Sequence, residues 1–399
     1  MHPPGESMGS IFRVKNLCQG LTSMSHKCYV FTPFNFSEDW NSLVKFITVP
    51  VVGKGNFSKK VYKVIRKILD IRILSNYSVL NPQVFNASIN RISNSLLDTI
   101  KENGLDLDVI IGETEIGGYI LKKIKNELDF PILVDYQNFW PEELVEHKII
   151  KRNSRRYKFL IDIEKDIFDN VDSVITVSKA LEQFLGKKFL KNDFSKIKWI
   201  KNGGVPLLKS PLKKELPPKI INSGMVVQRS NFKFFFEGLK YVFKKYPETE
   251  VYVTRKGERL NEVMHLAEKM KLNINFYWKD TFKEFVDILS NCHVGVVSST
   301  YNLTRKLGFV AKIYDYFSVG IPIVGNDIGG FTSIIKEEQV GKLSSNDPKD
   351  LAEKIIEFIE DPKLAYECGM RGIELLKNKY NVKNSAGQLI EYINNINNK

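Results

Sequence analysis

The residues best suited to chemistry lie together in the C-terminal third of the chain, in the stretch 312–330. Lys312 and Asp315 stand three residues apart, a spacing that places a cation and a carboxylate side by side on one face of a helix. Gly329-Gly330 follows in a turn whose backbone N–H groups can face an anion where the next helix begins. A carboxylate helix, a buried strand and a glycine turn in this order predict a nucleotide site at the carboxyl edge of a parallel sheet.

Local sequence preferences predict the elements that position these side chains. Residues 312–319 repeat apolar side chains at helical spacing, and Gly320 ends that helix because glycine tolerates a positive φ. Residues 322–324 are too short and too β-branched for another helix and are typical of a buried strand. The turn then spans residues 326–330. The predicted buried side of the helix carries Ile313, Tyr316, Phe317 and Val319.

This stretch resembles the donor-site signature of glycosyltransferase family 4, whose members have the GT-B fold. In that signature an acidic residue precedes Gly-x-Pro-x-Val at a fixed spacing, and a Gly-Gly turn follows. The resemblance implies that Asp315 binds the ribose hydroxyls of a nucleotide sugar. It also implies an α/β protein of two facing Rossmann-like, doubly wound domains that trap a nucleotide-diphosphate sugar between them. The other matching positions are Gly320, Pro322, Val324, Gly329 and Gly330.

The second half of the chain alternates strand and helix patterns, which indicates a parallel, doubly wound sheet. The predicted strands span residues 219–224, 250–254, 274–278 and 294–299. The predicted helices between them span residues 232–245, 258–270 and 281–290. In the first half we expect strands at 26–33, 108–112 and 131–135, and a helix at 84–104.

A second segment carries the same resemblance. Residues 171–178 and 197–205 resemble the approach to the hinge between the two domains of these enzymes. Ser178 is predicted to cap a helix, and Asn202-Gly203 to form a turn. The predicted divisions are an acceptor-binding domain at 1–205, a proline-rich linker at 206–218, a donor-binding domain at 219–380 and a helix at 381–399 that crosses back to the first domain.

The amino-terminal residues match the family only in part. Family members begin with a strand, a glycine loop that faces the acceptor and the donor phosphates, and a helix. Here residues 1–9 are predicted to form the glycine loop, with Gly5 and Gly9 at the acceptor, and Ser10 begins the helix. The first strand is missing. Two interpretations stay open: the true start lies upstream, or the first sheet lacks an interior strand.

A loop in the first half resembles the acceptor site of the family. Asp135 matches the aspartate of an Asp-x-His pair, and Gln137 stands in place of the histidine. Glutamine can hydrogen-bond a sugar hydroxyl but cannot relay a proton, so both residues are expected to bind the acceptor and no catalytic residue is assigned. Tyr136, Phe139 and Trp140 could stack on an acceptor sugar or pack against one another.

The donor signature departs from the family pattern at its charged positions. Met225 stands where the family has an arginine that binds the diphosphate, and Leu307 where it has a glutamate that contacts the donor sugar. The family's lysine falls at Ser230 or, with a slip of one residue, at Arg229. Charge on the leaving diphosphate must be neutralised as the glycosidic bond breaks.

Nearby basic residues could supply the missing positive charge. We select Arg229 and Lys312 as donor-binding cations. Arg305 and Lys306 are interpreted as surface residues.

The sequence indicates no resident metal or cofactor. Asp106 and Asp108 open a predicted strand, where a metal-binding Asp-x-Asp should close one, so we interpret them as capping residues. The four cysteines, with no Cys-x-x-Cys pair, are typical of reduced core residues of a cytosolic protein. The expected co-substrate is the nucleotide-diphosphate sugar.

Net charge is +13, and residues 45–75 carry eight basic side chains against the single acid Asp70. One interpretation is a general excess of lysine on solvated faces. The other is a basic amphipathic helix that lies on anionic lipid, with Lys59, Lys60, Lys63 and Lys67 opposite an apolar stripe. The chain has no apolar run long enough to cross a bilayer, which predicts a cytoplasmic protein with at most peripheral contact with an anionic membrane.

The resemblance implies a hexosyl-type, retaining and metal-independent glycosyltransferase that moves a sugar to a hydroxyl of a glycan or lipid-linked glycan. An alternative is a GT-B-like subunit that binds without transferring, motivated by Met225, Leu307 and Gln137. A nucleic-acid-binding protein ranks last because the chain lacks the interleaved aromatic and basic residues of such modules, so no specific nucleic-acid partner is expected.

Overall fold

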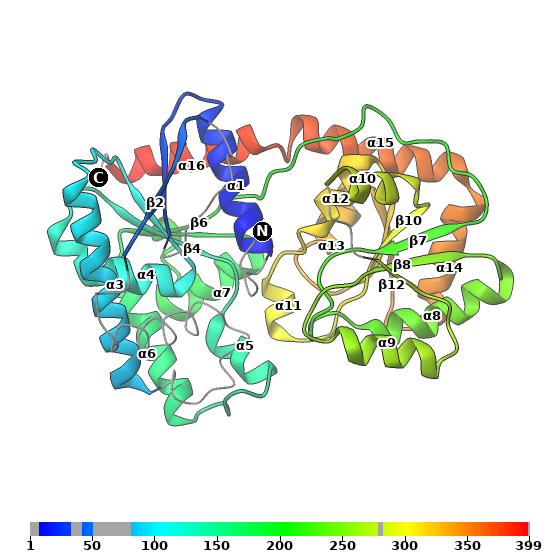
Figure 1. Ribbon diagram of the computed structural model, residues 1–399, viewed down its shortest axis with the longest axis horizontal. Coiled ribbons are helices and arrows are strands. Elements are labelled where there is room, and N and C mark those ends of the chain that lie inside the picture. Colours follow the sequence, from blue (N-terminus) through cyan, green and yellow to red (C-terminus); the bar gives the residue numbers. More distant parts are fainter. Residues whose placement is uncertain (1–7, 33–41, 51–80, 278–281, 398–399) are drawn as a thin grey trace. The chain divides into compact units, whose positions relative to one another are not determined.

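The computed structural model describes residues 8–32, 42–50, 81–277 and 282–397. The chain folds into two compact units. The first combines Met1–Asn202 with Val382–Lys399, and the second is the continuous segment Gly203–Asn381. Figure 1 labels their helices and strands.

The first unit contains a four-stranded parallel sheet in the order β3-β4-β5-β6. A separate parallel pair is formed by β1 and β2. The strands are β1 (Cys28–Thr32), β2 (Val44–Thr48), β3 (Ile110–Glu113), β4 (Ile132–Tyr136), β5 (Ser173–Thr176) and β6 (Ile197–Trp199). Strands β4 and β5 are buried along their whole length, as parallel strands covered by helices on both faces should be.

Seven described helices belong to the first unit: α1 (Met8–Thr22), α3 (Pro82–Glu102), α4 (Thr114–Ile124), α5 (Trp140–Glu146), α6 (Arg155–Asn170), α7 (Lys179–Phe189) and α16 (Val382–Asn397). Ser178 caps α7 as predicted, because its Oγ accepts the backbone N–H of Leu181 at 3.0 Å. Helices α1 and α16 approach closely at Gly20, where a Cβ would lie 2.2 Å from the carbonyl oxygen of Val382.

The prediction of a glycine loop over residues 1–9 is wrong at its carboxyl end. Helix α1 begins at Met8, so Gly9 lies inside a helix. A single glycine costs a helix only about 1 kcal/mol relative to alanine, and the apolar residues that follow compensate for it. Gly5 lies outside the described residues.

The second unit contains a six-stranded parallel sheet in the order β12-β11-β10-β7-β8-β9. Its strands are β7 (Lys219–Asn222), β8 (Glu250–Thr254), β9 (Asn275–Tyr277), β10 (Val294–Val297), β11 (Ile323–Asn326) and β12 (Gly341–Ser344). Its helices are α8 (Phe232–Lys245), α9 (Leu260–Lys269), α10 (Phe282–Asn291), α11 (Leu303–Leu307), α12 (Lys312–Val319), α13 (Thr332–Glu338), α14 (Pro348–Glu360) and α15 (Pro362–Asn378). The prediction of an α/β protein with parallel sheets is confirmed.

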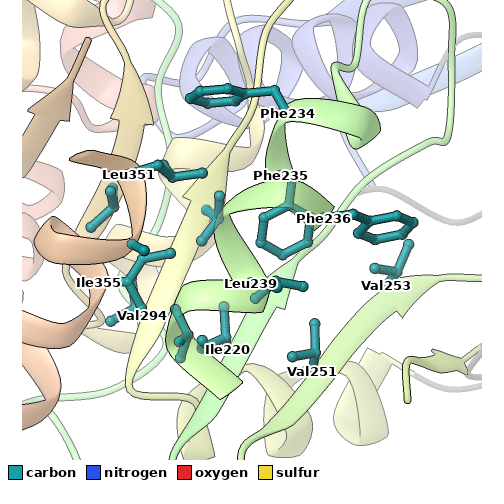
Figure 2. Close-up of a cluster of buried hydrophobic side chains, with 14 of the residues drawn as sticks. Ile220, Phe234, Phe235, Phe236, Leu239, Val251, Val253, Val294, Leu351 and Ile355 are labelled. Atoms are coloured by element: carbon teal, nitrogen blue, oxygen red, sulfur yellow. The ribbon is translucent and has the colours of Figure 1, made fainter. Parts of the chain in front are cut away.

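One hydrophobic cluster holds α8 and α14 against this sheet. Figure 2 shows Phe235 and Leu239 of α8 meeting side chains of the strands and of α14. The predicted bounds of α8 and β8 are confirmed. Helix α9 begins two residues later than predicted, after Gly257, whose φ is 139°. A Cβ there would lie 2.2 Å from the carbonyl oxygen of Val226, so the close approach of this loop delays the helix.

Two predictions concern charge and contact with a membrane. The predicted basic helix around Lys59 and Lys67 lies outside the described residues. Within the described part of the chain, every helix is too short or too polar to cross a bilayer. All four cysteines are buried thiols, as predicted for core residues.

A buried ion pair ties α1 to the sheet of the first unit. The Nε of Arg13 lies 2.6 Å from Oδ2 of Asp135, and the two side chains are 1% and 2% exposed. The guanidinium also donates to the carbonyl oxygen of Ile200 at 3.0 Å and to Oδ1 of Asn202. These contacts join the first helix to the carboxyl ends of β4 and β6.

We expect Asp135→Ala to lower the free energy of unfolding by about 3 to 5 kcal/mol, because the Arg13 charge stays buried without its partner. Chemical denaturation measures the change. Lys101→Ala is the matched control: Lys101 pairs with Glu127 at 3.4 Å, and both are 58% exposed. Its loss should stay below about 1 kcal/mol. Equal losses in the two variants would contradict the assignment.

Candidate functional site

The candidate site of the second unit is built around α12. This helix spans Lys312–Val319 as predicted, and its predicted apolar side is buried. Gly320 ends it in the left-handed conformation with a φ of 67°, which also agrees with the prediction. Lys312 and Asp315 are partly exposed on the other side of the helix.

Tyr316 fixes α12 against the sheet. Its hydroxyl donates to the carbonyl oxygen of Val296 at 3.2 Å and accepts the backbone N–H of Ser223 at 3.1 Å. Its ring lies on β10 at Gly295, where a Cβ would come within 2.6 Å of the ring. The carboxyl ends of β7 and β10 therefore set the position of the helix that carries the candidate residues.

Lys312 reaches across the end of β7. Its Nζ donates to Oδ1 of Asn222 at 2.8 Å, and the Asn222 amide donates to Oγ of Ser298 at 3.1 Å. Gly224, with a φ of 86°, makes room for the lysine, since a Cβ there would lie 3.2 Å from Lys312 Cε. The amine is therefore held by an amide oxygen.

Burial governs the charges of both residues. Burial, together with the positive charge of Arg305 and against the charge of Asp315, lowers the pKa of Lys312 to about 7. Burial also raises the pKa of Asp315 to about 7, against the opposing charge of Lys312. Both groups therefore change charge near neutral pH, which is typical of a functional site.

The glycine turn lies next to α11. Gly329 has a φ of 113°, and a Cβ there would lie 2.9 Å from the carbonyl oxygen of Arg305 and 3.6 Å from its Cδ. Helix α13 then begins at Thr332. A glycine is required here because of this positive φ and because the turn closely approaches the backbone carbonyl group of Arg305.

Arg305 occupies the centre of this region. Its Nη2 donates to the carbonyl oxygen of Arg229 at 3.1 Å, and its Nε is buried without a hydrogen-bond partner. Burial, together with the charge of Arg229, lowers the pKa of Arg305 to about 9. Arg305, which was predicted to lie at the surface, is only partly exposed and its Nε is buried, whereas the neighbouring Lys306 is exposed as predicted.

The structure brings three of the five donor candidates, Arg229, Lys312 and Gly329, around Arg305, and Asp315 interacts with Lys312. Gly330, the fifth, is the next residue of the turn. Leu307, which stands where the signature has a glutamate, is only 5% exposed and belongs to the core. In the described part of the chain, no three His, Cys, Asp or Glu side chains are placed to hold a metal ion.

Comparison with known proteins identifies the family. Residues 207–375, which include every donor candidate, match the model of the glycosyl transferases group 1. The second unit of the chain therefore carries the domain of this family.

Relatives of this group 1 glycosyltransferase cover most of its length. It is 22% identical over 338 residues to an uncharacterized glycosyltransferase of Methanocaldococcus jannaschii, covering 79% of this chain and 80% of that protein. Sucrose-phosphate synthase of Thermosynechococcus elongatus matches with a TM-score of 0.70 at 18% identity, over 96% of this chain and 92% of that one. Anabaena HepE in complex with UDP and glucose matches with a TM-score of 0.63 at 13% identity, over 98% and 97%. The fold is GT-B, as predicted.

In the first unit of this glycosyltransferase, the acceptor candidates lie near the ends of β3 and β4. Asp135 is buried in its pair with Arg13. Gln137 is partly exposed, and its amide donates to Oε1 of Glu113 at the end of β3. The neighbouring aromatic residues are core: Tyr136 and Phe139 are 0% exposed and Trp140 is 1% exposed. The stacking interpretation for them is therefore wrong, and the packing interpretation is confirmed.

Buried carboxyl groups lie behind these residues, and the sequence analysis did not identify them. The hydroxyl of Tyr136 donates to Oε2 of Glu164 at 2.5 Å. Burial raises the pKa of Glu164 to about 8. Burial also raises the pKa of Glu115, and the charge of Glu164 adds to the shift. Both glutamates stand on helical faces otherwise filled by apolar residues, which is the sequence signal that could have found them.

We expect Glu164→Gln to stabilise the first unit increasingly as pH rises from 5 to 8. The unfolded carboxyl ionises near pH 4.5 and the folded one near 8, so the wild type loses stability across this window and glutamine does not. The gain at pH 8 should be about 1 to 3 kcal/mol, measured by urea denaturation at several pH values. Glu102→Gln, on an exposed residue of α3, should show no such trend. A pH-independent difference for Glu164→Gln would contradict the raised pKa.

Proposed function

We propose that this group 1 glycosyltransferase moves a hexosyl group from a nucleotide-diphosphate sugar to a hydroxyl of a glycan or lipid-linked glycan, with retention of configuration and without a metal ion. The observation that carries the proposal is the arrangement around α12. There a carboxylate, a lysine and a glycine turn meet at the carboxyl edge of the six-stranded sheet. Open α/β sheets bind nucleotides at this edge.

Each donor residue has a role that fits its chemistry. Asp315 accepts hydrogen bonds from the ribose hydroxyls, and Lys312 and Arg229 face the diphosphate. Gly329 and Gly330 allow the phosphates to approach the backbone. In the transfer, the bond from the anomeric carbon to the β-phosphoryl oxygen breaks and its electron pair stays on the phosphate. The acceptor oxygen bonds to that carbon and its proton is released, so the cations stabilise the charge that develops on the leaving group.

Two similar structures support a uridine nucleotide as one donor to test. HepE of Anabaena was crystallised with UDP and glucose. TarM of S. aureus, similar over 76% of this chain with a TM-score of 0.59, was crystallised with UDP and alpha-GlcNAc-glycerol. UDP-glucose and UDP-GlcNAc are therefore tested first, and GDP is the comparison nucleotide.

We assign the acceptor to the first unit and the donor to the second. Gln137 binds an acceptor hydroxyl through its amide, and Asp135 positions that loop through its pair with Arg13. Gly5 and Gly9 stay proposed acceptor residues. We also propose a cytoplasmic enzyme whose basic segment at residues 45–75 contacts anionic membrane peripherally.

Asp315→Ala should weaken UDP or GDP binding by about tenfold to a hundredfold, since it removes hydrogen bonds to a charged acceptor. Isothermal titration measures the affinities. Glu353→Ala is the control, because Glu353 is an exposed carboxylate of α14 in the same unit, with its Oε1 3.8 Å from Nζ of Lys349. Equal affinity in the wild type and Asp315→Ala would count against the site.

Nucleotide binding should exchange protons, with a sign that depends on pH. At pH 8 the free Lys312 amine, with a pKa of about 7, is mostly neutral, and it takes up close to one proton beside the diphosphate. At pH 6 the Asp315 carboxyl, with a pKa of about 7, is mostly protonated and releases a proton when it binds the ribose. Titration in buffers of different ionisation enthalpy measures both. Lys312→Met should abolish the uptake, whereas Lys336→Met should not; uptake that persists in Lys312→Met would contradict the assignment.

The alternative of a binding subunit without transfer rests on the buried Leu307, which places an apolar side chain where the signature has a carboxylate. Release of free sugar from UDP-glucose, or its transfer to any acceptor, eliminates this alternative. Tight UDP binding with neither reaction across an acceptor panel supports it.

A further inference from the structure

We propose that Arg305 is the principal diphosphate-binding residue of this enzyme, so that the cation which the family carries after the first strand of the donor domain is supplied here from α11. This inference rests on the proposed function of the same site. It goes beyond the donor residues selected from the sequence, among which Arg305 was rejected in favour of Arg229 and Lys312.

Arg305 lies among the other candidate residues of the site. Arg305 contacts three separate parts of the site: its Nη2 donates to the carbonyl oxygen of Arg229, its Cδ lies beside the Gly329 turn, and its charge acts on Lys312. Asn302 fixes the short helix α11, because its Oδ1 accepts the backbone N–H of Arg305 at 2.9 Å. The guanidinium therefore lies where the loops after β7, β10 and β11 meet.

The Arg305 guanidinium also has hydrogen-bond donor capacity that the protein leaves unsatisfied. Nε of Arg305 is buried and has no hydrogen-bond partner. A guanidinium can offer five N–H donors, and the structure satisfies one of them with a carbonyl oxygen of Arg229. Burying such a donor without a partner is costly, and exceptions of this kind in native proteins often mark a site completed by a ligand.

The positive charges of Arg305 and Lys312 also favour an anion at this place. Within the described residues, neither Arg305 nor Lys312 forms an ion pair with a carboxylate. Their nearest fixed partners are an amide oxygen and a backbone carbonyl oxygen. Positive charges gathered in a poorly solvated place repel one another, and an anion relieves that repulsion. Two oxygens of a phosphate group can accept a bidentate pair of hydrogen bonds from the donor fork of arginine.

The loop after β7 differs from the family signature at the positions that should carry cations. Met225 removes the arginine that the family signature places after β7, while the lysine position falls at Ser230 or Arg229. The backbone of this loop accepts the Arg305 guanidinium at the carbonyl oxygen of Arg229. Gly329 is required at its position because its φ is 113° and a Cβ would lie 2.9 Å from the backbone carbonyl oxygen of Arg305. The glycine turn therefore lies directly against the backbone of α11, with the Arg305 side chain in ordinary contact beside it.

The test compares Arg305→Met and Arg305→Lys with Lys306→Met, the exposed neighbour on the same helix. Affinities are measured by isothermal titration for UDP, GDP, uridine, guanosine and inorganic pyrophosphate. We expect Arg305→Met to lose about tenfold to a hundredfold in affinity for UDP or GDP and for pyrophosphate, with an unchanged affinity for the nucleoside. Arg305→Lys should lose less, because it keeps the charge and loses the fork, and Lys306→Met should match the wild type.

The outcomes separate this inference from the proposed function. Binding of UDP or GDP that depends on Asp315 but is unchanged in Arg305→Met overturns the inference and leaves the proposed function intact. Equal losses for nucleoside and diphosphate in Arg305→Met also overturn it, since they indicate a structural role. If the wild type binds none of these nucleotides or pyrophosphate, both fail. Should Arg305→Met not fold, Arg305→Lys decides: the inference requires a selective loss of pyrophosphate affinity in that variant.

Discussion

Desolvated charge at the carboxyl edge of the six-stranded sheet is the constraint on which the rest of the second unit depends. Lys312 and Asp315 are each withdrawn from water, and each compensates only part of the cost of burying the other. Such a pair persists only when the surrounding structure holds it in place. Tyr316 does so, because one hydroxyl joins α12 to both β7 and β10.

The glycines around the site follow from the same constraint. Gly224 makes room for the lysine stem and Gly295 for the tyrosine ring, because a long side chain crosses the backbone at close range at each. Gly329 instead lets the turn approach the backbone carbonyl group of Arg305. The anion-binding character of this edge therefore comes from side chains that glycine lets approach, together with the exposed backbone of the turn.

Local pattern predicted the second unit well, because its helices and strands are amphipathic or β-branched along their whole length. Helix α8, strand β8 and the end of α12 at Gly320 lie where the sequence placed them. Features made by contacts distant in sequence could not be predicted. The pair of Arg13 with Asp135 joins residues 122 positions apart, and Arg305 differs from the exposed Lys306 only in its tertiary neighbours. The prediction that Tyr136, Phe139 and Trp140 stack on a sugar was wrong for the same reason, because their burial depends on contacts with distant parts of the chain.

Because helix α16 belongs to the first unit, the two units differ in when their folding can be completed during synthesis. The second unit is one uninterrupted segment, and the chain enters and leaves it side by side, where Gly204 pairs with Asn381. The first unit lacks α16 until the whole second unit has been synthesised, although Leu389 of that helix belongs to the same cluster as Leu133 and Ile175. Domains generally fold as units in the order of synthesis. Here the second unit can complete its core before the first, because the first unit needs a helix that follows the second in the chain.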